Sequence, residues 1–161
     1  MTEVRDLRAE ETPFLEEMLY AALAWRPDVE LPPREWVLAH PQVVVFHAGW
    51  GRAGDVGLVA EEAGEPIGLA WYRFFTDAEH GEGYVDEATP ELAIAVVDGC
   101  RGRGVGKLLM EAIHARARAD GVEQISLSVD RDNPARRLYE RLGYVELEPD
   151  DENGRMVLRL A

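Results

Sequence analysis

Hydrophobic and polar positions follow regular spacings along the first half of the chain, and the spacing changes from segment to segment. Residues 4–7 alternate weakly, which predicts a short first strand. Residues 12–24 carry apolar side chains at helical spacing behind a Thr-Pro start, which predicts a helix. After a proline-rich interruption, residues 34–39 favour a second, short helix. The run at residues 43–46 is rich in valine and predicts extended structure.

The middle of the chain predicts a hairpin followed by a central strand. Residues 56–62 and 66–75 are strand-like, and the small polar turn at residues 63–65 joins them. An acidic loop comes next. Residues 92–97 are then apolar without interruption over the length of a strand, which is typical of a strand buried on both faces of a sheet.

Helices and strands alternate in the last third of the chain. Apolar positions at helical spacing begin at Val105 and stop before Gly121, which can adopt the left-handed conformation that ends a helix. With the strand before it and the next strand after it, this helix should form a right-handed parallel crossover. The remaining elements that we expect are a strand at residues 125–129, a helix at 135–142 and a last pair of strands at 144–147 and 156–160.

Composition narrows the class of protein. The chain has 161 residues, 47% of them hydrophobic and 30% charged, and we expect one domain over residues 1–161. No apolar stretch is long enough to span a bilayer, and no His or Cys spacing is typical of metal ligation, so we expect neither a membrane nor a metal site. The single cysteine, Cys100, cannot form an internal disulfide, which favours the reducing cytoplasm.

Charge is distributed unevenly. The net charge of −14 argues against a nucleic-acid partner, because phosphate binding needs clustered basic side chains. The charge is compatible with a cationic partner, and it is equally explained by solubility alone. Residues 101–118 are the exception, since they hold five basic residues against one acid, Glu111. An acidic chain with one basic helix start indicates a localised anion site.

That helix start coincides with a glycine-rich turn at residues 101–106. Its glycines keep Cβ atoms away from a ligand. The first backbone N–H groups of the following helix lack intrahelical partners and lie at the positive end of the helix dipole. Such a terminus suits a pyrophosphate, and Arg101, Arg103 and Lys107 add positive charge.

There are three alternatives to this interpretation of residues 101–106 as a pyrophosphate-binding turn. A P-loop would need glycine at position 101 and serine or threonine at position 108, where the chain has Arg101 and Leu108. A dinucleotide-binding turn, as in an oxidoreductase, would need glycine at position 107, which is Lys107. A purely structural turn remains the simplest alternative.

The segment Arg-Gly-Arg-Gly-Val-Gly at residues 101–106 fits the pattern Arg/Gln-x-x-Gly-x-Gly/Ala and follows the strand that contains residues 94–96. Together these resemble the acetyl-CoA motif of the GNAT family of N-acetyltransferases. A second block, Asn-Pro-Ala-Arg-Arg-Leu-Tyr-Glu-Arg-Leu-Gly-Tyr at residues 133–144, is similar to the next motif of that family. The two blocks have the expected order and spacing and cover roughly residues 92–147.

The resemblance implies an α/β GNAT-like fold, with a twisted, mixed and mostly antiparallel sheet of six or seven strands and helices on both faces. It implies that acetyl-CoA lies where the central strand diverges from the parallel strand after the crossover, with its pantetheine arm along the central strand as an added strand. The cofactor-binding residues implied are Ile94, Ala95, Val96, Arg101, Gly102, Arg103, Gly104, Val105, Gly106, Lys107 and Asn133. The side chain of Asn133 could instead only cap the helix that follows it.

The resemblance also implies catalytic roles. Tyr139 matches the family's tyrosine that protonates the leaving thiolate, although a tyrosine in the core would show the same spacing. Alanine acetylases of ribosomal proteins carry a glutamate at a position that corresponds to Ser128 when counted back from Asn133 and to Leu127 when counted back from Tyr139. Neither residue is a base, so the general base must lie elsewhere. We expect it to be Glu91, at the mouth of the central strand; a solvated loop carboxylate is the alternative.

The function expected is transfer of an acetyl group from acetyl-CoA to a primary amine by direct attack. A non-catalytic acyl-CoA-binding or regulatory module is the rival, because it would keep the glycine turn without needing Tyr139. The acceptor could be a small molecule or a protein, and a cationic one would suit the acidic loop. A homodimer would be consistent with the family.

Overall fold

The computed structural model describes residues 1–161 and contains one sheet of seven strands in the order β1-β2-β3-β4-β5-β7-β6. The strands are β1 (Thr2–Asp6), β2 (Val56–Glu62), β3 (Glu65–Arg73), β4 (Glu91–Val96), β5 (Gln124–Ser128), β6 (Val145–Glu146) and β7 (Arg155–Arg159). The helices are the 3-10 turn η1 (Ala9–Glu11), α1 (Thr12–Leu23), α2 (Arg34–Ala39), α3 (Pro41–Val44), α4 (Val105–Ala119) and α5 (Arg136–Arg141).

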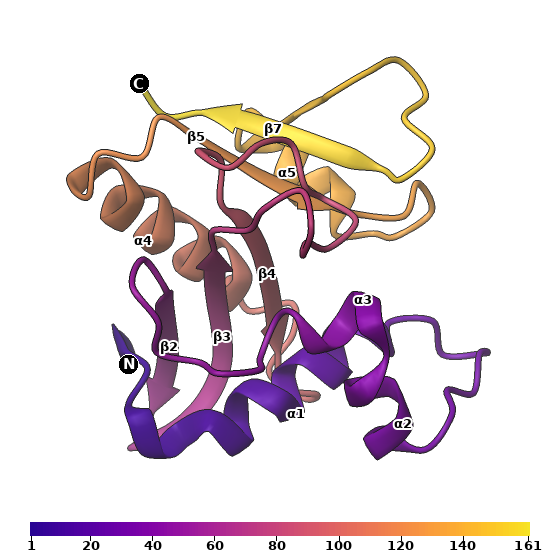
Figure 1. Ribbon diagram of the computed structural model, residues 1–161. Helices are drawn as coiled ribbons and strands as arrows, with labels where there is room; N and C mark the ends of the chain where they lie inside the picture. Colours follow the sequence, from indigo (N-terminus) through magenta and orange to yellow (C-terminus); the bar gives the residue numbers. More distant parts are fainter.

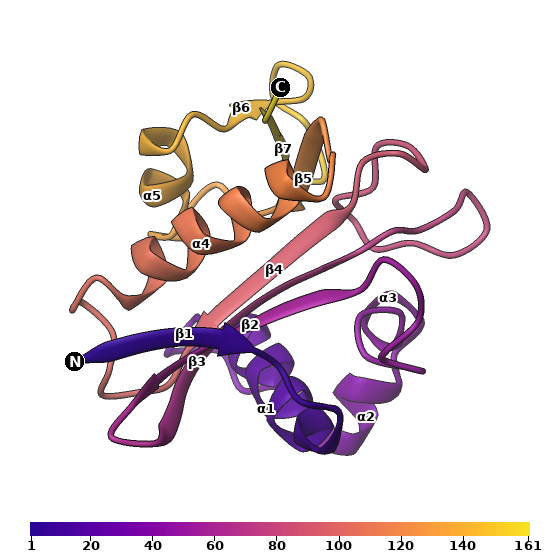
Figure 2. The same cartoon turned by 90° about the vertical axis from the view of Figure 1, so that its left-hand side faces the viewer.

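Helices cover both faces of this sheet. In Figure 2, α4 and α5 lie on one face, and α1, α2 and α3 lie on the other. Two separate apolar clusters correspond to these faces: Leu109 and Ile113 of α4 belong to the first, and Leu15 and Leu19 of α1 to the second. None of the helices combines the length and hydrophobicity that a membrane crossing requires.

Strand β3 shows why one sheet can have two cores. Successive side chains of a strand point to opposite faces. Ala70 and Tyr72 accordingly pack in the cluster on the α4 side, and Leu69 and Trp71 pack in the cluster on the α1 side. This double burial explains the continuous apolar runs that the sequence shows in the central strands.

Strands β4 and β5 run parallel but remain paired for only one residue pair, Glu91 with Ser126. On its other edge, β4 pairs with β3 over its whole length. Figure 1 shows β5 meeting β4 near the start of β4 and turning away from the rest of it, with β7 on the far side of β5. The sheet therefore splits along one side of β4, as the resemblance implied.

The expected fold class is confirmed, because the sheet is mixed, mostly antiparallel and covered on both faces. Most elements lie within a few residues of their predicted positions. The extended structure predicted at residues 43–46 is wrong, because α3 and a following turn occupy this segment. Its carbonyl groups bond to side chains of β3 instead of to a neighbouring strand: the Phe46 carbonyl accepts from Trp71 Nε1, and the Val45 carbonyl accepts from Arg73.

Arg73, at the end of β3, is fully buried and anchors this segment. Its guanidinium pairs with the Asp55 carboxylate at 2.9 Å. It also donates to the carbonyls of Val45, Ala48 and Gly49 at 2.7–3.1 Å. Because the charge is paired and its donors are used, the arginine can be accommodated inside the protein.

We expect the substitution Arg73→Met to lower the free energy of unfolding by about 3–5 kcal/mol, because it leaves a buried carboxylate without its positive partner and three carbonyls without their donor. Urea denaturation at pH 7 measures the change. Arg52→Met is the matched control, since Arg52 lies 3.9 Å from the same Asp55 but is 40% exposed. It should cost less than about 1 kcal/mol, and equal losses in the two variants would contradict the anchoring role.

Candidate active site

The glycine turn leads directly from β4 into α4. Gly102 and Gly104 have φ angles of +77° and +83°, and Gly104 is the N-cap of the helix. The first hydrogen bond across the helix start runs from the Leu108 N–H to the Gly104 carbonyl at 3.0 Å. None of the backbone N–H groups from Arg101 to Lys107 has an acceptor within the chain. The turn is therefore a continuous row of free donors at the positive end of a helix of 15 residues.

The basic side chains of the turn are all at the surface. Arg103 pairs with Glu62 at 3.0 Å, and Lys107 lies 4.0 Å from Glu111. Arg101 donates from Nε to the Val96 carbonyl at 3.3 Å, which ties the turn to the end of β4. Exposed pairs of this kind are weak, so an anion at the turn can recruit these side chains at little cost.

The open edge of β4 continues from this turn. The Val97 N–H donates to the Ile67 carbonyl of β3, so the backbone groups of Ile94 and Val96 point to the other side by strand alternation. On that side β5 has already turned away. Ile94 thus presents its main-chain donor and acceptor in a gap next to the free amides of the turn, and Val96 presents its N–H there, since its carbonyl accepts from Arg101. The side chain of Ala95, by contrast, packs in the core on the α1 side.

Glu91 begins β4 at the point where the sheet splits. It is 2% exposed, so it is not the solvated loop carboxylate that the sequence left as an alternative. Its Oε2 accepts a hydrogen bond from the Gly83 N–H at 2.9 Å, and its buried Oε1 has no partner. Burial raises the pKa of Glu91 to about 7, with hydrogen bonds from Gly83 and Gly81 opposing the rise and the charge of Glu82 adding to it.

The loop between β3 and β4 holds this carboxyl group through two glycines. A Cβ at Gly81 would lie 2.6 Å from both Glu91 Oε2 and the Phe46 ring, and a Cβ at Gly83 would lie 2.9 Å from Glu91 Oε2. Only glycine allows the loop to approach so closely. Sequence reasoning treated this loop as merely acidic and missed both residues; the signal that it passed over was the Gly-x-Gly pattern inside a charged segment.

Tyr139 lies on α5, on the other face of the sheet. It is 8% exposed and belongs to the apolar cluster on the α4 side, with its ring centroid 5.9 Å from that of Tyr144. Burial raises the pKa of Tyr139 to about 12, so the phenol keeps its proton at neutral pH. Leu92 packs in this same cluster, so its neighbour Glu91 points to the opposite face, where α1 and α3 lie.

Asn133 precedes α5, and its side-chain oxygen accepts from the Ala135 N–H at 3.0 Å. This bond closes a turn ahead of the helix and does not cap it, because α5 begins at Arg136 with Ala135 as its N-cap, and the amide nitrogen of Asn133 stays available. Nearby, Arg26 from the segment after α1 forms a two-bond ion pair with Asp132 at 2.7 and 2.9 Å. This pair joins the segment after α1 to the segment between β5 and α5.

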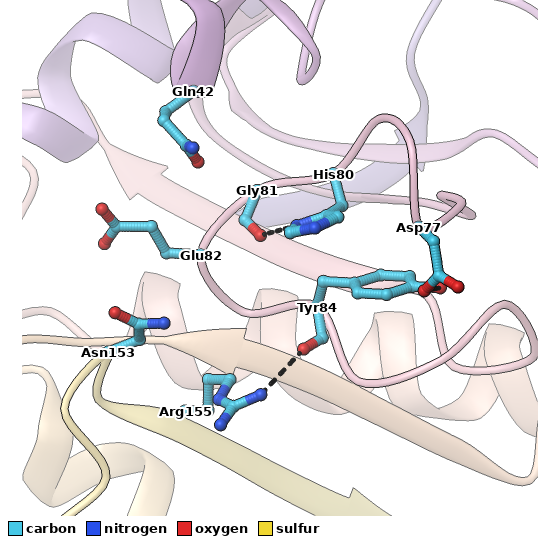
Figure 3. A pocket seen from close by; sticks show the side chains of 8 residues that line it. All are labelled: Gln42, Asp77, His80, Gly81, Glu82, Tyr84, Asn153 and Arg155. Carbon is cyan, nitrogen blue, oxygen red and sulfur yellow. Dashed lines mark hydrogen bonds between the residues drawn. The ribbon is translucent and has the colours of Figure 1, made fainter.

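A cavity of about 370 Å³ lies against the loop between β3 and β4 (Figure 3). Its lining comes from α3, from the loop between β3 and β4, and from the segment around β7: Gln42, Asp77, His80, Gly81, Glu82, Tyr84, Asn153 and Arg155. Gly81 forms part of its wall and also lies close to the Glu91 carboxyl group.

Polar and acidic groups dominate this cavity. Arg155 is neutralised by Asp151 at 2.9 Å, and it also donates to the Tyr84 carbonyl at 3.3 Å. Asp77 accepts from the Tyr84 hydroxyl at 3.0 Å. The carboxylates of Asp77 and Glu82 therefore leave the cavity negatively charged, which favours a cation. No three His, Cys, Asp or Glu side chains lie close enough together to hold a metal ion.

Comparison with known proteins identifies the family. The model of the acetyltransferase (GNAT) family matches residues 4–144, so the chain belongs to this family and the resemblance is confirmed. A mycothiol acetyltransferase of Thermobispora bispora is 36% identical over 93 residues, which are 57% of this chain and 30% of that protein. An L-methionine sulfoximine/L-methionine sulfone acetyltransferase of Pseudomonas aeruginosa is 37% identical over 95 residues, 58% of this chain and 52% of that protein.

The match thus spans about a third to a half of the length of these relatives. Among solved structures, the PaiA N-acetyltransferase of Thermoplasma acidophilum in complex with coenzyme A has a TM-score of 0.74 at 15% identity, and the alignment covers 99% of both chains. At this identity the similarity establishes the fold.

The raised pKa of Glu91 predicts a pH-dependent stability. Below about pH 4.5 this carboxyl is protonated in both folded and unfolded chains. Between about pH 4.5 and 7 the unfolded chain releases this proton while the folded chain keeps it, so the folded state loses up to about 3 kcal/mol and the loss levels off above about pH 7. Glu91→Gln has no carboxyl group to titrate at this position. The free energy of unfolding of the variant should therefore rise relative to that of the parent between pH 4.5 and 8. Urea unfolding at both pH values measures it, and a constant difference would contradict the raised pKa.

Proposed function

We propose that the chain is an N-acetyltransferase that moves the acetyl group of acetyl-CoA to a primary amine, with residues 1–161 acting as one catalytic domain. The observation that carries the proposal is the row of free backbone donors from Arg101 to Lys107, adjoining the open edge of β4. Membership of the GNAT family and the coenzyme A complex of the PaiA acetyltransferase support it.

In this proposal the diphosphate of acetyl-CoA accepts hydrogen bonds from the amides of the glycine turn. Arg101, Arg103 and Lys107 leave their weak surface pairs to neutralise it. The pantetheine arm adds to the free edge of β4 at Ile94 and Val96 as an extra strand would. The amide nitrogen of Asn133 borders the same gap. The thioester then lies in the split between β4 and β5.

The two catalytic residues act from opposite faces of the sheet. Glu91 takes a proton from the acceptor ammonium group, and the free amine attacks the thioester carbonyl. A pKa of about 7 suits a general base at neutral pH. A backbone N–H near Val96 stabilises the oxyanion. When the C–S bond breaks, Tyr139 donates its proton to the thiolate of CoA, and the acceptor leaves as an amide.

The acceptor binds in the polar cavity, which Gly81, a close neighbour of the Glu91 carboxyl group, helps to line. The carboxylates of Asp77 and Glu82 attract an ammonium group, and the amide side chains of Gln42 and Asn153 can bond to polar groups of the same molecule. A cationic, hydrophilic amine fits this lining better than an apolar one.

We expect Tyr139→Phe to leave the dissociation constant of acetyl-CoA within about twofold and to lower kcat by about 10²-fold or more, because only the proton donor is lost. Isothermal titration and release of free CoA measure the two quantities. Tyr144→Phe is the control, since this buried tyrosine bonds only to His114 at 2.8 Å. It should keep its turnover. An unchanged kcat in Tyr139→Phe would remove the acid role and favour another proton donor.

Glu91→Gln should lower kcat/KM at pH 7 and remove the inflection near pH 7 from the acidic limb of the pH profile, which in the parent should reflect the pKa of Glu91, about 7. Activity should recover at high pH, where more of the acceptor amine is already unprotonated. Glu87→Gln, which removes an exposed carboxylate from the same loop, should keep the inflection. If the inflection survives in Glu91→Gln, a different group is the base.

A further inference from the structure

Ser126 of β5 is the register partner of Glu91 in the single pair that joins β4 to β5. Ser126 is fully buried, and its backbone N–H donates to the Pro90 carbonyl at 3.0 Å. Its hydroxyl group takes no part in this pairing. Instead, it donates to the Gly83 carbonyl at 2.7 Å. A buried hydroxyl group of the sheet thus bonds to the loop that lies over Glu91.

Gly83 connects this hydroxyl group with the carboxylate. Its carbonyl accepts from Ser126, and its N–H donates to Glu91 Oε2 at 2.9 Å. A Cβ at Gly83 would also lie 2.9 Å from the backbone of Leu127, so the loop lies directly against β5. The position of the Gly83 N–H therefore depends on how the Gly83 carbonyl is held.

We propose that Ser126 is a positioning residue for the general base: acting through Gly83, it fixes Glu91 Oε2 and leaves Oε1 as the oxygen that takes the proton from the acceptor amine. This inference rests on the proposed function. The different roles of the two oxygens are inferred from their contacts: Oε1 is buried without any partner, and Oε2 accepts a hydrogen bond.

Few other groups can stabilise the Glu91 carboxylate. On β3, its cross-strand neighbour Arg73 directs its guanidinium to Asp55 and to three backbone carbonyls. From the loop, Glu82 adds a negative charge, and from the segment after α3 the nearby side chain is the apolar Phe46. The N–H groups of Gly83 and Gly81 are the groups that favour the charged form. Weakening the first of them should raise the pKa of Glu91.

The test is Ser126→Ala, which removes one oxygen and leaves the backbone pairing of β5 intact. The ¹³C signal of the Glu91 side chain, assigned by its absence in Glu91→Gln, reports the protonation of this group without turnover. We expect its pKa to rise by about one unit. We also expect kcat/KM at pH 7 to fall roughly fivefold and to return at high pH, with the KM for acetyl-CoA unchanged.

Ser128→Ala is the matched control, because Ser128 lies two residues along the same strand and its hydroxyl also bonds to a loop carbonyl, that of Asn153. The pKa of Glu91 should stay at its parent value in this variant. A pKa in Ser126→Ala that is unchanged or lower contradicts the positioning role, even if Glu91 is the base. If Glu91→Gln keeps the inflection near pH 7 in the rate profile, the assignment of Glu91 as the base in the proposed function fails instead.

Discussion

The proposed site depends on the pairing of one strand: β4 is bound to β3 along its full length but to β5 at a single residue pair. The backbone donors and acceptors of a strand inside a sheet normally form hydrogen bonds with both neighbouring strands. Because β5 turns away after Ser126, the later residues of β4 keep one edge unpaired. The glycine turn follows that edge immediately, so free main-chain groups of the strand and of the helix start form one continuous surface.

The split also determines where the chemistry can occur. It gives access to the sheet from both faces, with Glu91 directed to the side of α1 and α3, and Tyr139 in the cluster on the side of α4. An acceptor and a leaving group can then occupy opposite sides of one gap. The loop with Gly81 and Gly83 closes over the carboxyl group and keeps water from it, at a cost in stability that the rest of the fold must offset.

Much of this could be predicted from the sequence because the signals are local. The glycine turn, the apolar run of β4 and the stripe of α4 each lie within a few consecutive residues. The extended structure expected at residues 43–46 is wrong because contacts with Trp71 and Arg73, which lie far along the chain, determine the conformation of this segment. The environment of Glu91 could not be predicted for the same reason, since the contact between Gly83 and Ser126 joins residues 43 positions apart.

The most direct test of the central claim follows the backbone amides of the isotopically labelled protein while coenzyme A is added. We predict that the amide signals of residues 102–107 shift first and furthest, together with those of Ile94 and Val96. We also predict that the shifts saturate below millimolar coenzyme A. Shifts confined to other parts of the chain, or none at millimolar concentration, would contradict it.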